Sequence, residues 1–203
     1  AQGGKKDRCG KDNQNRQKKR GQESLMKSIT LIGYMCVGKT TVGKELAKRL
    51  GQTFYDLDWY IEERFHTKVP EIFAQYGEQH FRDLERRMLH EAAEFENIVL
   101  SCGGGTPCFF DNMEYLNSVS TTVYLKASSH TILEHLKISK GRRPLLEDKT
   151  PEELKAFVEN QLADRQPFYS KAQFVQEVSP LCTHEKIDNI CNEIIEKIKT
   201  TDK

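Results

Sequence analysis

The stretch Ser28-Ile-Thr-Leu-Ile-Gly33-Tyr-Met-Cys-Val-Gly38-Lys39-Thr40 decides the fold of this chain. Its last eight residues match the pattern G-x-x-x-x-G-K-[ST], between an apolar run that predicts a strand and a run that predicts a helix. In such a loop the glycines let backbone N–H groups converge on phosphate oxygens, and the helix N-terminus adds partial positive charge. The stretch therefore predicts a phosphate-binding loop. The alternative is a glycine turn with an incidental lysine.

The residue types in this loop predict contacts to ATP and Mg²⁺. We expect Lys39 to reach the β- and γ-phosphates and the hydroxyl of Thr40 to bind Mg²⁺. Cys36 is expected to be a small spacer and not a nucleophile. The remaining residues expected to contact the nucleotide are Gly33, Cys36, Val37, Gly38 and Thr41.

Downstream of the loop, runs that predict strands alternate with runs of helical periodicity. Further strands are predicted at 53–56, 97–101, 121–125 and 173–178. Helices are predicted at 39–51, 128–139, 151–165 and 187–198, and a mostly helical region at 57–95. Strands that alternate with helices favour a parallel sheet covered by helices on both faces.

The composition fits one compact domain. The 203 residues are 37% hydrophobic, enough to bury a core, and the formal net charge of +1 provides no overall field for nucleic acid or an anionic membrane. The six cysteines form neither a C-x-x-C pair nor a zinc-type spacing, so we expect reduced thiols. The sequence contains no apolar run of about 18 residues and no signal peptide, so we expect a cytoplasmic protein.

Residues 1–25 differ from the rest, because they are rich in Lys and Arg and almost free of apolar side chains. We expect them to be disordered. They are either a basic arm for an acidic partner or an extension ahead of a natural start at Met26, and we favour the second interpretation. The domain with the phosphate-binding loop is then expected to span 26–203.

Two carboxylates follow the second predicted strand. Asp56 and Asp58 come where the carboxyl ends of parallel strands meet an active-site crevice. One can hold water on Mg²⁺, while the other can accept or orient the proton of an attacking hydroxyl. The alternative is that either acid caps the following helix.

Six short motifs together resemble the shikimate kinase family: GYMCVGKTT, DLD, GEQHFRDLE, SCGGG, RRPLL and DRQPFY, in this order. The resemblance covers nearly the whole chain from Met26. It implies a three-layer α/β sandwich with a five-stranded parallel sheet, a P-loop fold of the nucleoside monophosphate kinase type. Substrate-binding helices at about 57–95 and a lid at about 138–150 are also implied.

The resemblance further implies an activity and site residues. The expected reaction moves the γ-phosphate of ATP, with Mg²⁺, to the 3-hydroxyl of shikimate, on the pathway to chorismate and the aromatic amino acids. A monomer without nucleic-acid or membrane partners is expected. By position, Asp58 would meet the substrate hydroxyl and Asp56 would lie near Mg²⁺. The other implied roles are substrate binding by Arg82, Arg165, Gly103, Gly104 and Gly105, and closure of Arg143 over the transferred phosphate.

Local sequence alone leaves several of these roles open. Arg82 also fits a solvated helix face, the three glycines fit a plain turn, and Arg143 fits an ordinary charged loop. Glu85 lies three residues after Arg82 and is expected to hold it in place. Trp59 is expected to line the pocket. The six histidines form no evident catalytic pattern, and we assign them no catalytic role.

Two other functions are compatible with the motifs. One is a kinase on the same scaffold that acts on gluconate or a nucleoside monophosphate. The other is a catalytically idle ATP-binding or nucleic-acid-binding protein that uses the basic arm. Occupation of every expected catalytic position argues against the idle protein.

Overall fold

The computed structural model describes residues 27–138, 149–180 and 183–201. Across these residues the chain forms a five-stranded parallel sheet in the order β2-β3-β1-β4-β5. Its strands are β1 (Ile29–Ile32), β2 (Thr53–Asp56), β3 (Ile98–Ser101), β4 (Thr121–Lys126) and β5 (Phe174–Glu177). The predicted five-stranded parallel sheet is therefore confirmed.

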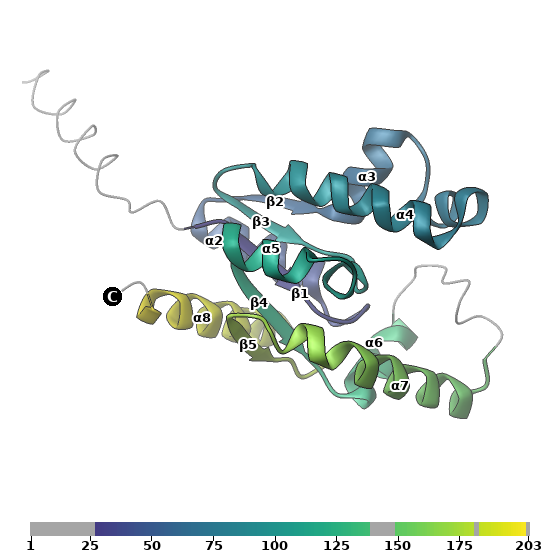
Figure 1. Cartoon of the computed structure of the whole chain (residues 1–203). Coiled ribbons are helices and arrows are strands. Elements are labelled where there is room, and N and C mark those ends of the chain that lie inside the picture. The colour runs from purple at the N-terminus through teal and green to yellow at the C-terminus, as the bar shows by residue number, and fades with distance from the viewer. Residues whose placement is uncertain (1–26, 139–148, 181–182, 202–203) are drawn as a thin grey trace, which may run out of the picture.

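Helices cover both faces of the sheet (Figure 1). The β1-to-β2 and β3-to-β4 connections run in opposite directions along the sheet, so right-handed crossovers put their helices on opposite faces. Figure 1 shows α3 and α4 near β2 and β3, and α6 and α7 near β4 and β5. The helices are α2 (Lys39–Leu50), α3 (Leu57–Phe65), α4 (Val69–Ala93), α5 (Asn112–Val119), α6 (Ser129–Ile138), α7 (Pro151–Tyr169) and α8 (His184–Thr201), with a short 3₁₀ turn η1 (Thr106–Cys108).

Helix α2 packs against the sheet and ends at a glycine. Val42, Leu46 and Ala47 recur on one face of α2 and are buried against the sheet, as their spacing predicts. Gly51 ends the helix with a left-handed φ of 66°, and its N–H bonds to the carbonyl of Ala47. Helix α8 also packs against α2, so α2 lies between the sheet and a second helix.

The mostly helical region predicted at 57–95 is confirmed. It contains α3 and α4, and α4 is interrupted at Gly77, whose φ of 78° is not helical. The predicted end of the helix at 151–165 is wrong, because α7 continues through Pro167 to Tyr169. An internal proline costs a helix roughly 3 kcal/mol. Burial of Tyr169, whose hydroxyl donates to the carbonyl of Gly104 at 2.5 Å, offsets this cost.

Some predictions fall outside the described residues. These are the tail at 1–25 and most of the lid, including Arg143. The assignment of 26–203 to one domain stays a prediction. Among the described helices, none has the length and apolarity needed to cross a membrane.

Candidate active site

The carboxyl ends of three adjacent strands place the predicted site residues side by side. Ser101 at the end of β3 pairs with Leu31 of β1 on one side and with Asp56 of β2 on the other. The loops that leave these strands therefore meet, as expected for an open parallel sheet. They line a cavity of about 570 Å³. Its walls include Gly38, Lys39, Thr40, Thr41, Asp56, Asp58, Gly103 and Gly104.

Glycines set the path of the phosphate loop between β1 and α2. Gly33 has a φ of 142°, and a Cβ there would lie 2.6 Å from the carbonyl oxygen of Leu125. Gly38 precedes α2 with a φ of 101° and offers no side-chain cap to the first N–H groups of the helix. The loop thus leaves these N–H groups for an anion. Cys36 also lines the cavity, whereas the side chain of Val37 is buried in the core.

Lys39 folds back over this loop. Its Nζ donates to the carbonyl oxygens of Gly33 and Tyr34, each at 2.9 Å, and the side chain is almost fully buried. Burial lowers the pKa of the Lys39 ammonium, while the carboxylates of Asp58 and Asp56 oppose the shift. The ammonium is therefore fixed within the cavity that the loop lines.

Asp56 has two roles in the structure. Its Oδ1 accepts from the N–H of Asp58 at 3.2 Å and so caps α3. Its Oδ2 accepts from the hydroxyl of Thr40 at 3.0 Å, which joins β2 to the start of α2. The capping alternative is confirmed for Asp56, and the same carboxylate still faces the cavity.

This pair of oxygens fits Mg²⁺. Along the described residues, no three or more His, Cys, Asp or Glu side chains gather to form a protein-only metal cage. Mg²⁺ does not need one, because it keeps several waters and commonly binds one or two protein oxygens together with phosphates. One hydroxyl and one carboxylate beside a phosphate loop are such a donor set.

Asp58 lies close enough to other charged side chains of the site for them to shift its pKa. Burial raises its pKa to about 7, and the nearby carboxylates of Asp56 and Glu85 add to the shift, against the Lys39 ammonium. A carboxylate whose pKa lies near neutral pH is suited to accept a proton from a hydroxyl.

The three consecutive glycines after β3 each make room for a different part of the site. A Cβ at Gly103 would lie 3.0 Å from Oδ1 of Asp58, and one at Gly104 would lie 3.3 Å from Nη1 of Arg165. A Cβ at Gly105 would lie 2.8 Å from Nη2 of Arg82. These glycines are therefore more than a turn, because their missing side chains let one carboxylate and two guanidinium groups converge.

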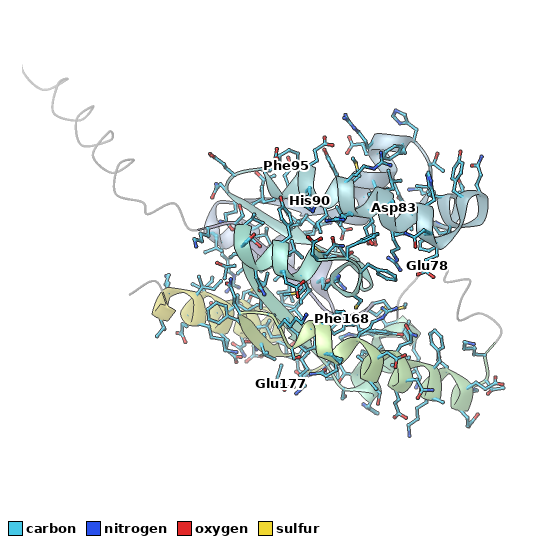
Figure 2. All side chains as sticks on the ribbon, viewed as in Figure 1. Glu78, Asp83, His90, Phe95, Phe168 and Glu177 are labelled. Atoms are coloured by element: carbon cyan, nitrogen blue, oxygen red, sulfur yellow. The ribbon has the colours of Figure 1, made fainter. Side chains whose placement is uncertain are left out.

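Arg82 is held rigidly on α4. Its Nη1 donates to Oε2 of Glu85 at 2.9 Å, and its Nη2 to Oε1 of Glu78 at 3.2 Å (Figure 2 labels Glu78). The ring of Phe109 lies 4.1 Å from its guanidinium carbon. Glu85 is buried and also accepts from the hydroxyl of Thr106 at 2.6 Å. The prediction that Glu85 holds Arg82 is confirmed.

Arg165 reaches the same glycine loop from α7. Its Nη2 donates to Oε1 of Gln161 at 2.6 Å, and its guanidinium carbon lies 5.3 Å from the centre of the Tyr34 ring. Tyr34 belongs to the phosphate loop, so Arg165 lies where that loop meets the glycines. The structure thus brings Asp58, Arg82 and Arg165 together.

Sequence reasoning missed two residues that support the site. Tyr169, within the DRQPFY motif, fixes Gly104 through its hydroxyl. His135 of α6 lines the cavity, and its Nδ1 lies 2.7 Å from the carbonyl oxygen of Cys36. The place of Tyr169 in its motif was a signal that could have identified it, whereas no local pattern pointed to His135. Trp59 lines the cavity as predicted, with half of its surface exposed.

Known proteins share both the sequence and the fold. Residues 35–199 match the family model described as shikimate kinase. Shikimate kinase of Parabacteroides distasonis is 50% identical over 170 residues, which cover 84% of this chain and 98% of that protein.

Two solved structures agree with this match. A crystal structure of shikimate kinase from Bacteroides thetaiotaomicron has a TM-score of 0.84 at 46% identity, covering 86% of this chain and 99% of that one. Shikimate kinase from Acinetobacter baumannii, solved in complex with shikimate, has a TM-score of 0.78 at 31% identity, covering 90% of this chain and 97% of that one. The similarity therefore extends over most of the length of each of these proteins.

Proposed function

The chain belongs to the shikimate kinase family, and from this premise we propose that it transfers the γ-phosphate of ATP to the 3-hydroxyl of shikimate. The products are shikimate 3-phosphate and ADP, on the pathway to the aromatic amino acids. The family resemblance drawn from the motifs is confirmed by the same matches.

The convergence at residues 103–105 is the observation that carries the proposal. Gly104 lies against the phosphate loop as well as Arg165, since a Cβ there would lie 3.2 Å from the N of Met35. Arg82 and Asp58 lie against the neighbouring glycines. A molecule in contact with these glycines would therefore face a phosphate site, a carboxylate and two guanidinium groups. Shikimate fits because it carries both a carboxylate and hydroxyl groups.

Each residue has a defined task in this reaction. Arg82 and Arg165 bind the shikimate carboxylate, because a planar guanidinium presents paired donors that match its two oxygens. Asp58 orients the 3-hydroxyl and accepts its proton as the oxygen attacks the γ-phosphorus. The bond from that phosphorus to the bridging oxygen of ADP breaks in the same transfer. Lys39 and the N–H groups of the loop stabilise the charge on the phosphate oxygens.

The proposal also includes a bound Mg²⁺ ion. Thr40 and Asp56 would hold it, because their oxygens already share a hydrogen bond at the edge of the phosphate loop. When bound, it neutralises negative charge on the nucleotide phosphates. Activity that disappears with EDTA and returns with added Mg²⁺ would support this assignment, and activity unaffected by EDTA would contradict it.

Two further parts of the proposal concern the whole molecule. We expect a monomer, which light scattering of the purified protein would check. We also expect a cytoplasmic location, which fractionation of cells that express the protein would check. A stable dimer or a membrane-bound pool would refute the corresponding expectation.

The acceptor is tested by offering the protein alternatives. Coupled ADP release should be fast with shikimate and at background with gluconate, AMP and UMP, and ³¹P NMR should identify shikimate 3-phosphate. Asp58→Asn is the matched variant, since it keeps the shape of the side chain and removes the proton acceptor. Turnover confined to gluconate or a nucleoside monophosphate would overturn the proposal.

A further inference from the structure

A hydrogen bond joins α6 to the phosphate loop. Nδ1 of His135 lies 2.7 Å from the carbonyl oxygen of Cys36, although the two residues are 99 positions apart. A carbonyl oxygen only accepts hydrogen bonds, so the imidazole carries a proton on Nδ1 and donates it. Both residues line the cavity together with Lys39 and Thr40.

The residue that accepts this bond has a costly backbone conformation. Cys36 has a φ of 61°, in the left-handed region that residues with a Cβ seldom adopt. The other positive φ values in the loop belong to Gly33 and Gly38, for which such angles carry no steric cost. Cys36 is therefore the loop residue, among those described, whose conformation most needs support from outside.

Two side chains bind different carbonyl groups of the loop. Lys39 binds the carbonyls of Gly33 and Tyr34, which precede it. The imidazole binds the carbonyl of Cys36 itself and so fixes the peptide plane between Cys36 and Val37. That plane leads directly into Gly38 and the first N–H groups of α2.

We infer that His135 is a positioning residue for the phosphate loop, whose imidazole holds Cys36 in its left-handed conformation and so presets the loop for nucleotide phosphates. It acts through Cys36 and not on the reacting atoms. The inference rests on the proposed function, because it takes the loop to bind a nucleotide. If His135 only stabilised the fold, its loss would have the same effect whatever residue stands at position 36. A positioning role requires that the effect depend on the steric cost of the Cβ of Cys36.

The test measures ADP affinity by calorimetry for His135→Ala in two backgrounds, the natural chain and Cys36→Gly. In the natural background the variant should bind ADP about tenfold more weakly, as the cost of an unsupported left-handed residue implies. With glycine at position 36 the same change should cost about twofold or less, because glycine adopts that φ freely. His130→Ala is the matched control, since His130 lies on the same helix with its side chain 80% exposed, and it should bind ADP like the natural chain.

Two more readouts separate positioning from general stability. His135→Asn should recover most of the affinity, because an Asn amide can donate from nearly the place of Nδ1. For His135→Ala, KM for ATP should rise while KM for shikimate stays the same. Thermal unfolding of every variant identifies any that fail to fold. If His135→Ala is one of these, the comparison of His135→Asn with His135→Gln in both backgrounds replaces it.

An equal loss in both backgrounds, no loss at all, or no recovery with Asn would overturn the inference. If the natural chain binds ADP and shows the expected pattern without phosphorylating shikimate, the inference stands and the proposed function fails. If the natural chain does not bind ADP, both fail.

Discussion

The phosphate loop and the acceptor pocket are built in different ways. The loop is one continuous segment, and its anchors include the ammonium of Lys39 on the carbonyls of Gly33 and Tyr34. The acceptor pocket combines α4, α7 and the glycines after β3, three segments distant in sequence. The loop is thus one sequence motif with a contact from a distant helix, that of His135 with Cys36, whereas the pocket depends throughout on how well three elements pack.

This difference predicts where mutations act. Changes in the loop should lower the rate of transfer, because its groups stabilise charge on the phosphate oxygens. Changes in the pocket should weaken shikimate binding, because in the proposed reaction its arginines bind a carboxylate that does not react.

Lys39→Ala should give the largest effect, a fall in kcat of about 10²- to 10³-fold, because it removes a preorganised cation from the phosphate site. Steady-state ADP release measures it. Lys48→Ala, an exposed position on the same helix, is the control and should keep the natural kcat. A normal kcat in Lys39→Ala would contradict the claim that loop residues determine the rate of transfer.

Arg165→Lys should raise KM for shikimate about 30-fold with a smaller change in kcat. Lysine retains the charge, but it loses the planar fork and the bond to Gln161. Arg87→Lys, an exposed position on α4, should leave KM unchanged. An unaltered KM in Arg165→Lys would remove Arg165 from the pocket.

Gly105→Ala should raise KM for shikimate about fivefold. The new methyl group would lie 2.8 Å from Nη2 of Arg82, so the flexible end of that side chain must move. The contrasting variant is Gly51→Ala, where space is open but φ is 66°. It should lower the free energy of unfolding by about 1 kcal/mol and leave KM unchanged. Equal KM values for Gly105→Ala and the natural chain would contradict the assignment of this glycine.

Thr150→Ala should give the smallest effect. Thr150 and Glu153 form a capping box at the start of α7, with bonds of 3.3 and 2.8 Å. Its loss should lower the free energy of unfolding by about 1 kcal/mol, measured by urea denaturation, with KM for shikimate unchanged. Thr150→Ser should restore the stability. A large rise in KM would mean that the position of Arg165 depends on the whole of α7.

The sequence predicted the phosphate loop more fully than the acceptor pocket, because the loop follows a local pattern and the pocket depends on long-range contacts. The loop, its flanking strand and helix, and the contact between Glu85 and Arg82 follow local spacing, so the pattern alone predicted them, whereas the substrate role of Arg82 came from the family resemblance. The approach of Arg165 to Tyr34 is a long-range contact that no local pattern contains, and the role of Arg165 came from the family resemblance. The interruption at Gly77 was missed, because a single glycine fits a helical pattern.

The remaining misses also come from tertiary contacts. The extension of α7 through Pro167 depends on Tyr169, which is buried and bonds to Gly104. The bond between His135 and Cys36 joins residues 99 positions apart, so no local pattern contains it. Such features become visible only when the elements are packed.

A crystal structure with ADP, Mg²⁺ and shikimate would test the central claim most directly. We expect the β-phosphate to accept hydrogen bonds from the N–H groups of the loop and the shikimate carboxylate to lie between Arg82 and Arg165. The 3-hydroxyl should then lie within hydrogen-bonding distance of Asp58. A shikimate molecule bound with its carboxylate away from both arginines, or with that hydroxyl turned away from Asp58, would contradict it.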